Sequence, residues 1–193
     1  MSSAAELCYT SINLYDGAMQ CDIPVNYIDL SHVRDIPDHQ CIYNDSDLDS
    51  SIIIELNQSV ESMTFNQYHN IAVTHYIEYC TIQNAQSYTI ESSGQISSNH
   101  IPNINGCTGY YVHGTMNTNK YNESVYNNIR VYMYVIHLTT VSTDLCIILN
   151  APAEFDANST VDHKQIVPDE SYCRYIIQQL LNTIKINDWS LFG

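Results

Sequence analysis

The sequence predicts an α+β fold in which an antiparallel β-sheet carries helices on its faces. Strand-like segments come first, a helix-like segment interrupts them, more strands follow, and a helix with a continuous apolar stripe lies near the C-terminus. The chain has 193 residues, of which 45% are apolar and 16 are Tyr, which is enough to build a substantial core. No internal repeat or long linker divides it, so residues 1–193 are expected to form one domain.

The N-terminal part is predicted to contain a β-hairpin and one helical turn. Residues 1–13 are expected to be a loosely ordered lead-in. Residues 14–23 indicate two strands joined at Asp16-Gly17, because this dipeptide readily supplies the positive φ that a tight hairpin needs. Asp29 is placed to cap a helical turn over residues 30–34, and Pro37 would end that turn.

Two further strands are predicted on either side of an acidic loop. Residues 40–43 and 51–56 have the composition of strands, and the loop between them carries three acids (Asp45, Asp47 and Asp49). The unbroken apolar run at residues 52–54 indicates a strand that is covered on both faces. A helix is predicted over residues 64–80, where aromatic and apolar residues recur at helical spacing and Thr64 is placed to cap.

The second half of the chain is predicted to repeat this order of strands and helix. The predicted strands are residues 87–90, 109–116, 125–138 and 143–150, with a hairpin turn at residues 141–144. The third of these is apolar on both faces. A loop is expected from Ala151-Pro152 to Pro168, followed by a helix over residues 169–184 with one apolar stripe. Apolar residues at positions 186–192 predict a docked C-terminal tail.

Charge and cysteine usage exclude several classes of function. The formal net charge is −15, with only six Lys and Arg, so the chain should repel nucleic acid and anionic membrane surfaces and favour a basic partner. Seven cysteines are spread singly, and no signal peptide or membrane span is recognisable, which indicates a reducing compartment, either nucleus or cytoplasm.

No motif predicts an enzyme, a metal site or a cofactor. His69 and His75 are six residues apart, a spacing that does not align them on one helix face. His113 and His137 lie in predicted strands, where a hydrogen-bonded structural role is the simpler interpretation. Nucleotide-binding loops and the nucleophile motif of hydrolases are absent from the sequence. A non-enzymatic protein is therefore expected.

The strongest functional signal is the acidic stretch between Asp22 and Glu61, which holds nine acids and one base, Arg34. Surface acids are often only solvated, and Asp29 and Asp38 also fit capping roles. Glu55 differs because it interrupts an apolar strand. Its carboxylate must reach solvent, pair with Arg34, or face a partner.

Four short blocks of this sequence form a signature when taken together in this order. The first is Leu14-Tyr15-x-Gly17-Ala18, Pro24, Ile28-Asp29-x-Ser31 and Arg34-x-Ile36-Pro37-Asp38-x-Gln40-x-Ile42-Tyr43. The second is the acidic strand Ser51-Ile52-Ile53-Ile54-Glu55-Leu56. The others are Thr143-Asp144-Leu145 through Asn150-x-Pro152, and the closing Asp188-x-x-Leu191-Phe192-Gly193. Together these four blocks resemble the Mog-type Ran guanine-nucleotide release factors. Residues 62–140 carry no such match.

This resemblance implies a curved antiparallel sheet between helices, shared with the photosystem PsbP proteins. It also implies a monomer that binds the GTPase Ran, without a metal or cofactor, and promotes loss of its bound guanine nucleotide. The implied Ran contacts are Asp29, Arg34, Asp38, Gln40 and Glu55.

Three positions depart from the family pattern. Cys41 and Gln58 stand where relatives usually carry acids, and Asp16 replaces a turn glycine. The first two departures bear on the strength of Ran binding, and three nearby acids are candidates to compensate (Asp45, Asp47 and Asp49). Two alternatives remain open, an adaptor for another basic partner without nucleotide release, and a PsbP-like scaffold with no exchange role.

Overall fold

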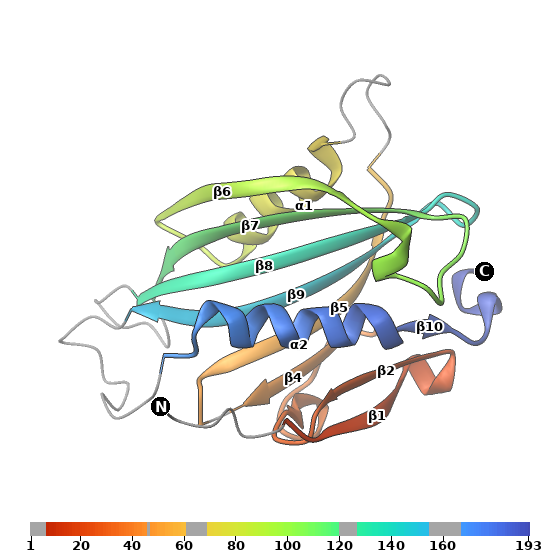
Figure 1. Ribbon diagram of the computed structural model, residues 1–193, viewed down its shortest axis with the longest axis horizontal. Helices are drawn as coiled ribbons and strands as arrows, with labels where there is room; N and C mark the ends of the chain where they lie inside the picture. The colour runs from red at the N-terminus through yellow and green to blue at the C-terminus, as the bar shows by residue number, and fades with distance from the viewer. Residues whose placement is uncertain (1–6, 46, 61–68, 120–126, 155–166) are drawn as a thin grey trace.

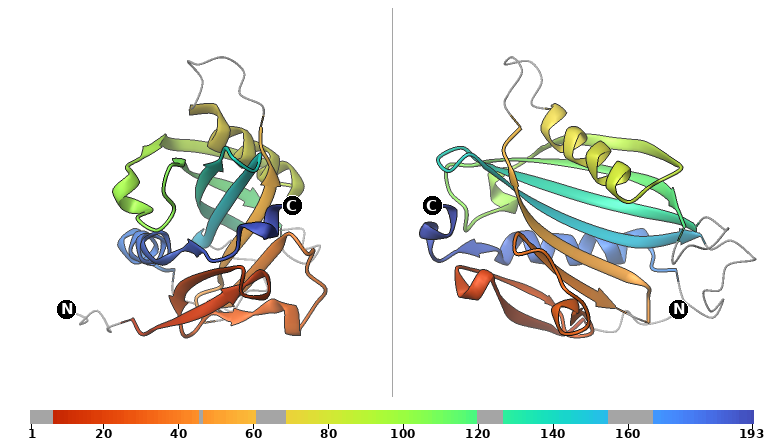
Figure 2. Two further views of the ribbon diagram at one scale, coloured as in Figure 1. Left: turned by 90° about the vertical axis from the view of Figure 1, so that its right-hand side faces the viewer. Right: turned by 180° about the vertical axis from the view of Figure 1, so that it is seen from behind.

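The fold of this computed structural model is a seven-stranded antiparallel sheet with a helix on each face and a smaller sheet beside one of the helices (Figures 1 and 2). The structure describes residues 7–45, 47–60, 69–119, 127–154 and 167–193. The large sheet has the order β3-β4-β5-β9-β8-β7-β6. Its strands are β3 (Ile28–Asp29), β4 (Gln40–Asp45), β5 (Ser50–Gln58), β6 (Ser87–Ile96), β7 (Thr108–Thr118), β8 (Asn127–Leu138) and β9 (Thr143–Glu154). The predicted α+β class and curved antiparallel sheet are confirmed.

Two helices cover opposite faces of the large sheet and divide the core in two. Helix α1 (His69–Ile82) lies over one face, and α2 (Glu170–Thr183) lies over the other (Figure 2). The second face also packs against the small sheet of β1 (Tyr9–Leu14), β2 (Met19–Pro24) and β10 (Lys185–Ile186). Strand β8 contributes side chains to both cores. Val131 and Met133 are buried toward α1, while Tyr132 and Ile136 are buried toward α2. Its prediction as apolar on both faces is confirmed.

The N-terminal hairpin is confirmed, but its first strand begins earlier than predicted. Residues 9–13, expected to be part of a loosely ordered lead-in, form most of β1 and pair with β2. Residues 1–6 lie outside the described residues. The turn passes through Tyr15, Asp16 and Gly17, all at positive φ, so the left-handed conformation predicted for the dipeptide extends over three residues.

The C-terminal tail docks as predicted. β10 pairs with β2, and the backbone amide of Asn187 donates to the carbonyl of Ala18 over 2.8 Å. In the last turn (Trp189–Phe192), Leu191 and Phe192 pack against the core, whereas Trp189 stays 43% exposed. The apolar anchor is therefore the end of the turn and not its tryptophan.

The helix boundaries follow local capping signals. Asp169 caps α2 by accepting a hydrogen bond from the Tyr172 amide over 2.7 Å, and the predicted apolar stripe is buried. α1 extends to Ile82, two residues beyond the predicted end, and Thr64 with the start of the predicted helix lies outside the described residues.

Two strands are longer than predicted. β6 runs from Ser87 to Ile96 and not only to Ile90, with a register shift against β7. β9 continues through Ala151 and Pro152 to Glu154, where a loop was predicted. Pro152 fits because it stands opposite Ile129, next to a register shift in β8 that interrupts the regular ladder.

Candidate partner-binding groove

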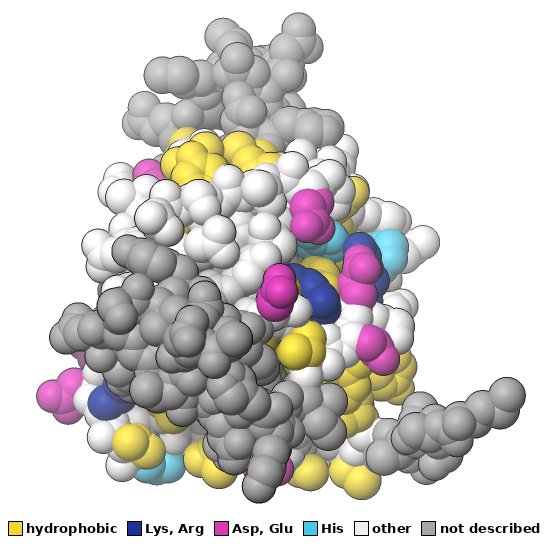
Figure 3. All heavy atoms as spheres, turned by 90° about the vertical axis from the view of Figure 1, so that its left-hand side faces the viewer, with side chains coloured by type: hydrophobic (Ala, Val, Ile, Leu, Met, Phe, Trp, Pro, Cys, Tyr) yellow, Lys and Arg dark blue, Asp and Glu magenta, His cyan; other side chains and the backbone are white. Residues whose placement is uncertain are grey.

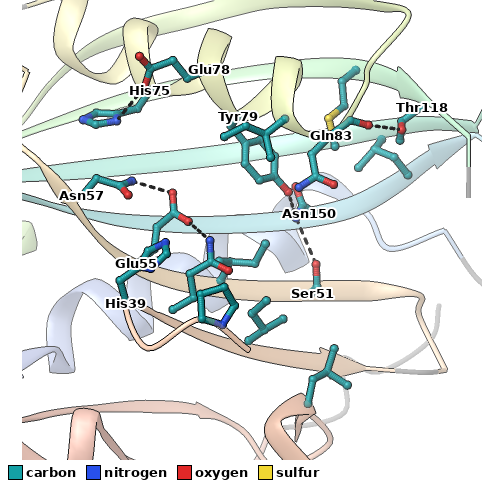
Figure 4. Close-up of a pocket in the computed structure, with 18 of the residues that line it drawn as sticks. His39, Ser51, Glu55, Asn57, His75, Glu78, Tyr79, Gln83, Thr118 and Asn150 are labelled. Atoms are coloured by element: carbon teal, nitrogen blue, oxygen red, sulfur yellow. Dashed lines mark hydrogen bonds and ion pairs between the residues drawn. The ribbon is translucent and has the colours of Figure 1, made fainter. Parts of the chain in front are cut away.

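The carboxylate of Glu55 lies on the floor of a groove between α1 and the segment that leads into β4. β5 alternates its side chains, so Ile53 and Glu55 face α1 while Ile52 and Ile54 are buried on the other face. Figure 4 shows Glu55 and Asn57 near one end of this groove and Ser51, Tyr79 and Asn150 at the other. The prediction that residues 52–54 are covered on both faces is confirmed.

Neutral amides hold the Glu55 carboxylate in place. The Gln40 side-chain amide donates to Oε2 over 2.8 Å, and the Asn57 amide donates to Oε1 over 2.8 Å. Only 9% of Glu55 is exposed. Within the described part of the chain, no Lys or Arg pairs with it, and Arg34 is an exposed side chain on the groove lip. The predicted contact residues Glu55 and Gln40 are therefore brought together, but the pairing of Glu55 with Arg34 is not found.

One wall of the groove is built by the 3-10 turn η2 (Leu30–His32). Asp29 caps this turn as predicted, because its Oδ1 accepts from the Ser31 amide over 2.8 Å. The turn presents Leu30, Val33 and Arg34 to the groove. Asp29 holds the backbone of this turn but does not line the groove itself. Asp38 is exposed in the turn that precedes β4. These two predicted Ran contacts therefore lie beside the groove and not on its lining.

Tyr15 fixes the base of this wall. Its hydroxyl lies 3.0 Å from the carbonyl of His39 and 3.0 Å from that of Ile54, so it joins the residue before β4 to the middle of β5. The backbone amide of Leu56 also donates to the His39 carbonyl over 2.9 Å. The N-terminal hairpin thus holds the strand pair that carries Gln40 and Glu55.

The opposite wall is the C-terminal half of α1, which sequence reasoning did not connect with the acidic stretch. His75, Glu78 and Tyr79 line the groove from this helix. At the far end, the Asn150 amide donates to the Tyr79 hydroxyl over 2.7 Å and to Ser51 Oγ over 3.2 Å. These contacts join residues 71 and 99 positions apart, and no local sequence signal could have predicted them.

A buried carboxylate ties this wall to the sheet. Asp144 accepts from His75 Nε2 over 2.8 Å, from His137 Nδ1 over 2.6 Å and from the Val60 amide over 3.1 Å. Burial alone would raise the pKa of Asp144, but the hydrogen bonds from the two histidines and the amide hold it below its ordinary value. The predicted structural role of His137 is confirmed.

His113 is also structural, as predicted. Its Nε2 lies 2.9 Å from the Tyr134 hydroxyl, and burial lowers its pKa to about 4, so the ring is neutral at physiological pH. The described residues contain no cluster of three or more His, Cys, Asp or Glu that could hold a metal ion. In the same part of the chain, no helix is long and apolar enough to cross a membrane.

The three loop acids predicted as supporting contacts have different environments. Asp45 is buried at the end of β4, where it accepts from the amides of Asp47 and Leu48 and the Asn26 side chain, and burial raises its pKa. It closes the β4–β5 turn and cannot serve as a surface contact, which corrects the prediction. Asp47 is exposed, and Asp49 lines the groove.

The two departures from the family pattern also lie in different places. Cys41 is half-buried and packs against the core on the α2 side of the sheet, because its neighbours Gln40 and Ile42 face the groove. Gln58 is exposed at the end of β5 and lines the groove. Of the two, only position 58 can change the charge of the groove directly.

On the face where α2 begins, one arginine is paired with an acid and another donates to a backbone carbonyl. Figure 3 shows dark-blue basic side chains directly beside magenta acidic side chains on this face. Arg174 Nε donates to Glu170 Oε1 over 2.9 Å, and Arg130 donates to the carbonyl of Pro168 over 3.1 Å. This pairing contrasts with the amide-bound carboxylate of Glu55.

Solved structures of other proteins share this fold. The Saccharomyces cerevisiae Ran-binding protein Mog1p superposes with a TM-score of 0.70 at 19% identity, covering 97% of this chain and 100% of that one. Cyanobacterial PsbP from Synechocystis sp. PCC 6803 gives a TM-score of 0.54 at 7% identity, covering 96% of each. The predicted likeness to both folds is confirmed.

Sequence comparison identifies the family. The chain is 32% identical over 188 residues to the probable ran guanine nucleotide release factor of Dictyostelium discoideum, covering 93% of this chain and 94% of that protein. It is 25% identical over 192 residues to the nuclear import protein mog1 of Schizosaccharomyces pombe, covering 94% and 100%. The model of the Ran-interacting Mog1 protein family matches residues 12–152. The chain therefore belongs to the Ran-interacting Mog1 protein family.

Proposed function

We propose that this protein binds the GTPase Ran through the groove around Glu55 and promotes release of its guanine nucleotide. The observation that carries the proposal is the Glu55 carboxylate, which is 9% exposed, fixed by two amides and without a cationic partner among the described residues. The two amide donors use only part of the acceptor capacity of the carboxylate, so a cation from a partner would add a charge-assisted contact at a group that is already largely desolvated. The names of the relatives, which refer to Ran and to nuclear import, support Ran as the partner and nuclear import as the process.

The protein acts in this proposal by binding and not by catalysis of its own. A GTPase holds its nucleotide through a lysine, backbone amides on the phosphates and Mg²⁺. A partner can promote nucleotide loss only if it binds the empty GTPase more tightly than the loaded one. Glu55 would supply this preference by binding a basic group of Ran that is free only when the nucleotide has left. The protein would then serve nucleocytoplasmic transport, in the nucleus and the cytoplasm.

Affinity for the two states of Ran tests this proposal. Calorimetry with nucleotide-free and GTP-loaded Ran should give a Kd at least about tenfold lower for the empty form, within the usual range of coupling free energies. Glu55→Gln should raise the Kd for empty Ran about 10- to 100-fold, because one charge-assisted contact is lost. The matched control is Glu91→Gln, which makes the same change on an exposed residue of β6.

Two results would contradict the proposal in different ways. Equal affinity for both states would leave an adaptor that binds without releasing nucleotide. If Glu55→Gln left the Kd for empty Ran unchanged, the groove would not be the binding site, even if the preference for empty Ran remained.

A further inference from the structure

The edges of the groove carry the two most exposed large apolar side chains in the described part of the molecule. Val33 is 76% exposed beside η2, and Ile82 is 73% exposed at the end of α1. Both line the groove, on opposite walls. Scattered exposed apolar residues are normal on a protein surface, but two that flank one groove indicate a contact surface.

The groove between these edges is apolar at its floor and anionic overall. Ile42 and Ile53 form part of the floor and belong to the core beneath α1. The described lining residues include three acids (Asp49, Glu55 and Glu78) and one base (Arg34), which gives a formal charge of −2 with His neutral. Glu55 alone among these acids is buried, so it is the acid that a partner must neutralise at close range.

The apolar side chains at the edges of the groove influence which kind of cationic partner can bind the Glu55 carboxylate tightly. A partner segment that lies along the groove would cover its floor between Glu55 and the two exposed side chains, so its apolar residues would exclude water from the groove and the charge pair would form in a medium of lower polarity. A polar basic segment would leave both side chains in water and gain only the screened attraction of surface charges. The two features together therefore select for a cation with apolar neighbours.

We infer that the groove takes a segment of a partner protein in which a lysine or arginine is flanked by apolar side chains. The cation binds the Glu55 carboxylate, and the apolar neighbours cover Val33 and Ile82. This inference rests on the proposed function, because Ran is the partner in which such a segment should be found, and it adds that the contact is apolar as well as electrostatic.

The first test separates the apolar contribution from the charge. The double variant Val33→Thr, Ile82→Thr replaces two exposed side chains and so leaves folding unaffected. It should raise the Kd for nucleotide-free Ran roughly 10- to 100-fold, while the slope of log Kd against log salt stays unchanged. Glu55→Gln should raise the Kd and flatten that slope. Val25→Thr is the matched control, because Val25 is 57% exposed and does not line the groove.

The second test does not depend on Ran. The isotope-labelled protein is titrated by NMR with two synthetic peptides of equal charge, one with lysine between leucines and one with lysine between serines. The amides of Val33, Glu55 and Ile82 should shift with the first peptide and not with the second. This result would support the inference even if Ran failed to bind, which would refute only the proposed function.

Two outcomes would overturn the inference. One is a double variant that binds Ran as tightly as the parent, which would make the contact purely electrostatic. The other is equal shifts with both peptides, or no shifts in the groove with either.

Discussion

The buried carboxylate of Asp144 should be the most costly single polar side chain to remove. It is fully buried and accepts from His75, His137 and Val60 at 2.6–3.1 Å and from the Ser59 hydroxyl at 3.3 Å, so Asp144→Ala leaves four donors without their acceptor. Hydrogen bonds to a charged group contribute about 1.5–3 kcal/mol each, and breaking a buried charged network costs about 3–5 kcal/mol. For a chain of this size the loss corresponds to a melting temperature lower by about 6–20 °C.

Thermal and urea unfolding, followed by circular dichroism, measure this loss. Asp47→Ala removes a carboxylate from an exposed turn position and should change the unfolding free energy by less than about 0.5 kcal/mol. A melting temperature of Asp144→Ala within about 2 °C of the parent would refute the reasoning, because the hydrogen bonds to this carboxylate would then add nothing to folding.

The difference in unfolding free energy between the parent and Asp144→Ala should depend on pH, because the pKa of Asp144 is lowered in the folded protein. A carboxyl group with a lower pKa in the folded state stabilises the protein fully above its unfolded pKa of about 4. That contribution is lost as the pH falls through the folded value. The gap in unfolding free energy between parent and Asp144→Ala should therefore be largest above about pH 4 and shrink in more acidic solution.

Three further substitutions test other parts of the account. Gly114→Ala should destabilise the fold by about 3 kcal/mol in urea unfolding, because the added Cβ would lie 2.0 Å from the Thr89 carbonyl oxygen. Gln58→Glu should tighten Ran binding about threefold at low salt and not at high salt, because it adds an acid at the groove. Cys41→Glu should instead lower the unfolding free energy by about 2 kcal/mol and leave the affinity for Ran unimproved, because it places a charge against the core. A Cys41→Glu protein as stable as the parent would show that this side chain does not face the core.

Elements whose signal lies in the local sequence could be predicted. The apolar stripe of α2, the Asp16-Gly17 turn and the capping of η2 by Asp29 each depend on residues a few positions apart. β1 was missed in part because three of its six side chains are exposed and, among the described residues, it pairs with β2 alone. The extension of β9 through Pro152 was missed because a proline in a strand is tolerated only beside an irregularity, and the sequence does not show that irregularity.

The candidate site shows the same division. Glu55 could be identified because it interrupts an apolar strand, and its amide partner Gln40 lies directly opposite in the register of β4 and β5. Asp45 was assigned to the surface because the sequence does not reveal that its carboxylate folds back onto the amides of Asp47 and Leu48. The α1 wall is formed by tertiary packing across the sheet, which no single-sequence pattern encodes.

The most direct test of the central claim is the rate at which a fluorescent guanine nucleotide leaves Ran when this protein is added. The account predicts faster release with the parent protein and with Glu91→Gln, and release near the rate of Ran alone with Glu55→Gln at the same concentration. Release that is equally fast with Glu55→Gln would contradict the role of the groove. A parent protein that does not change the rate would contradict the proposed function itself.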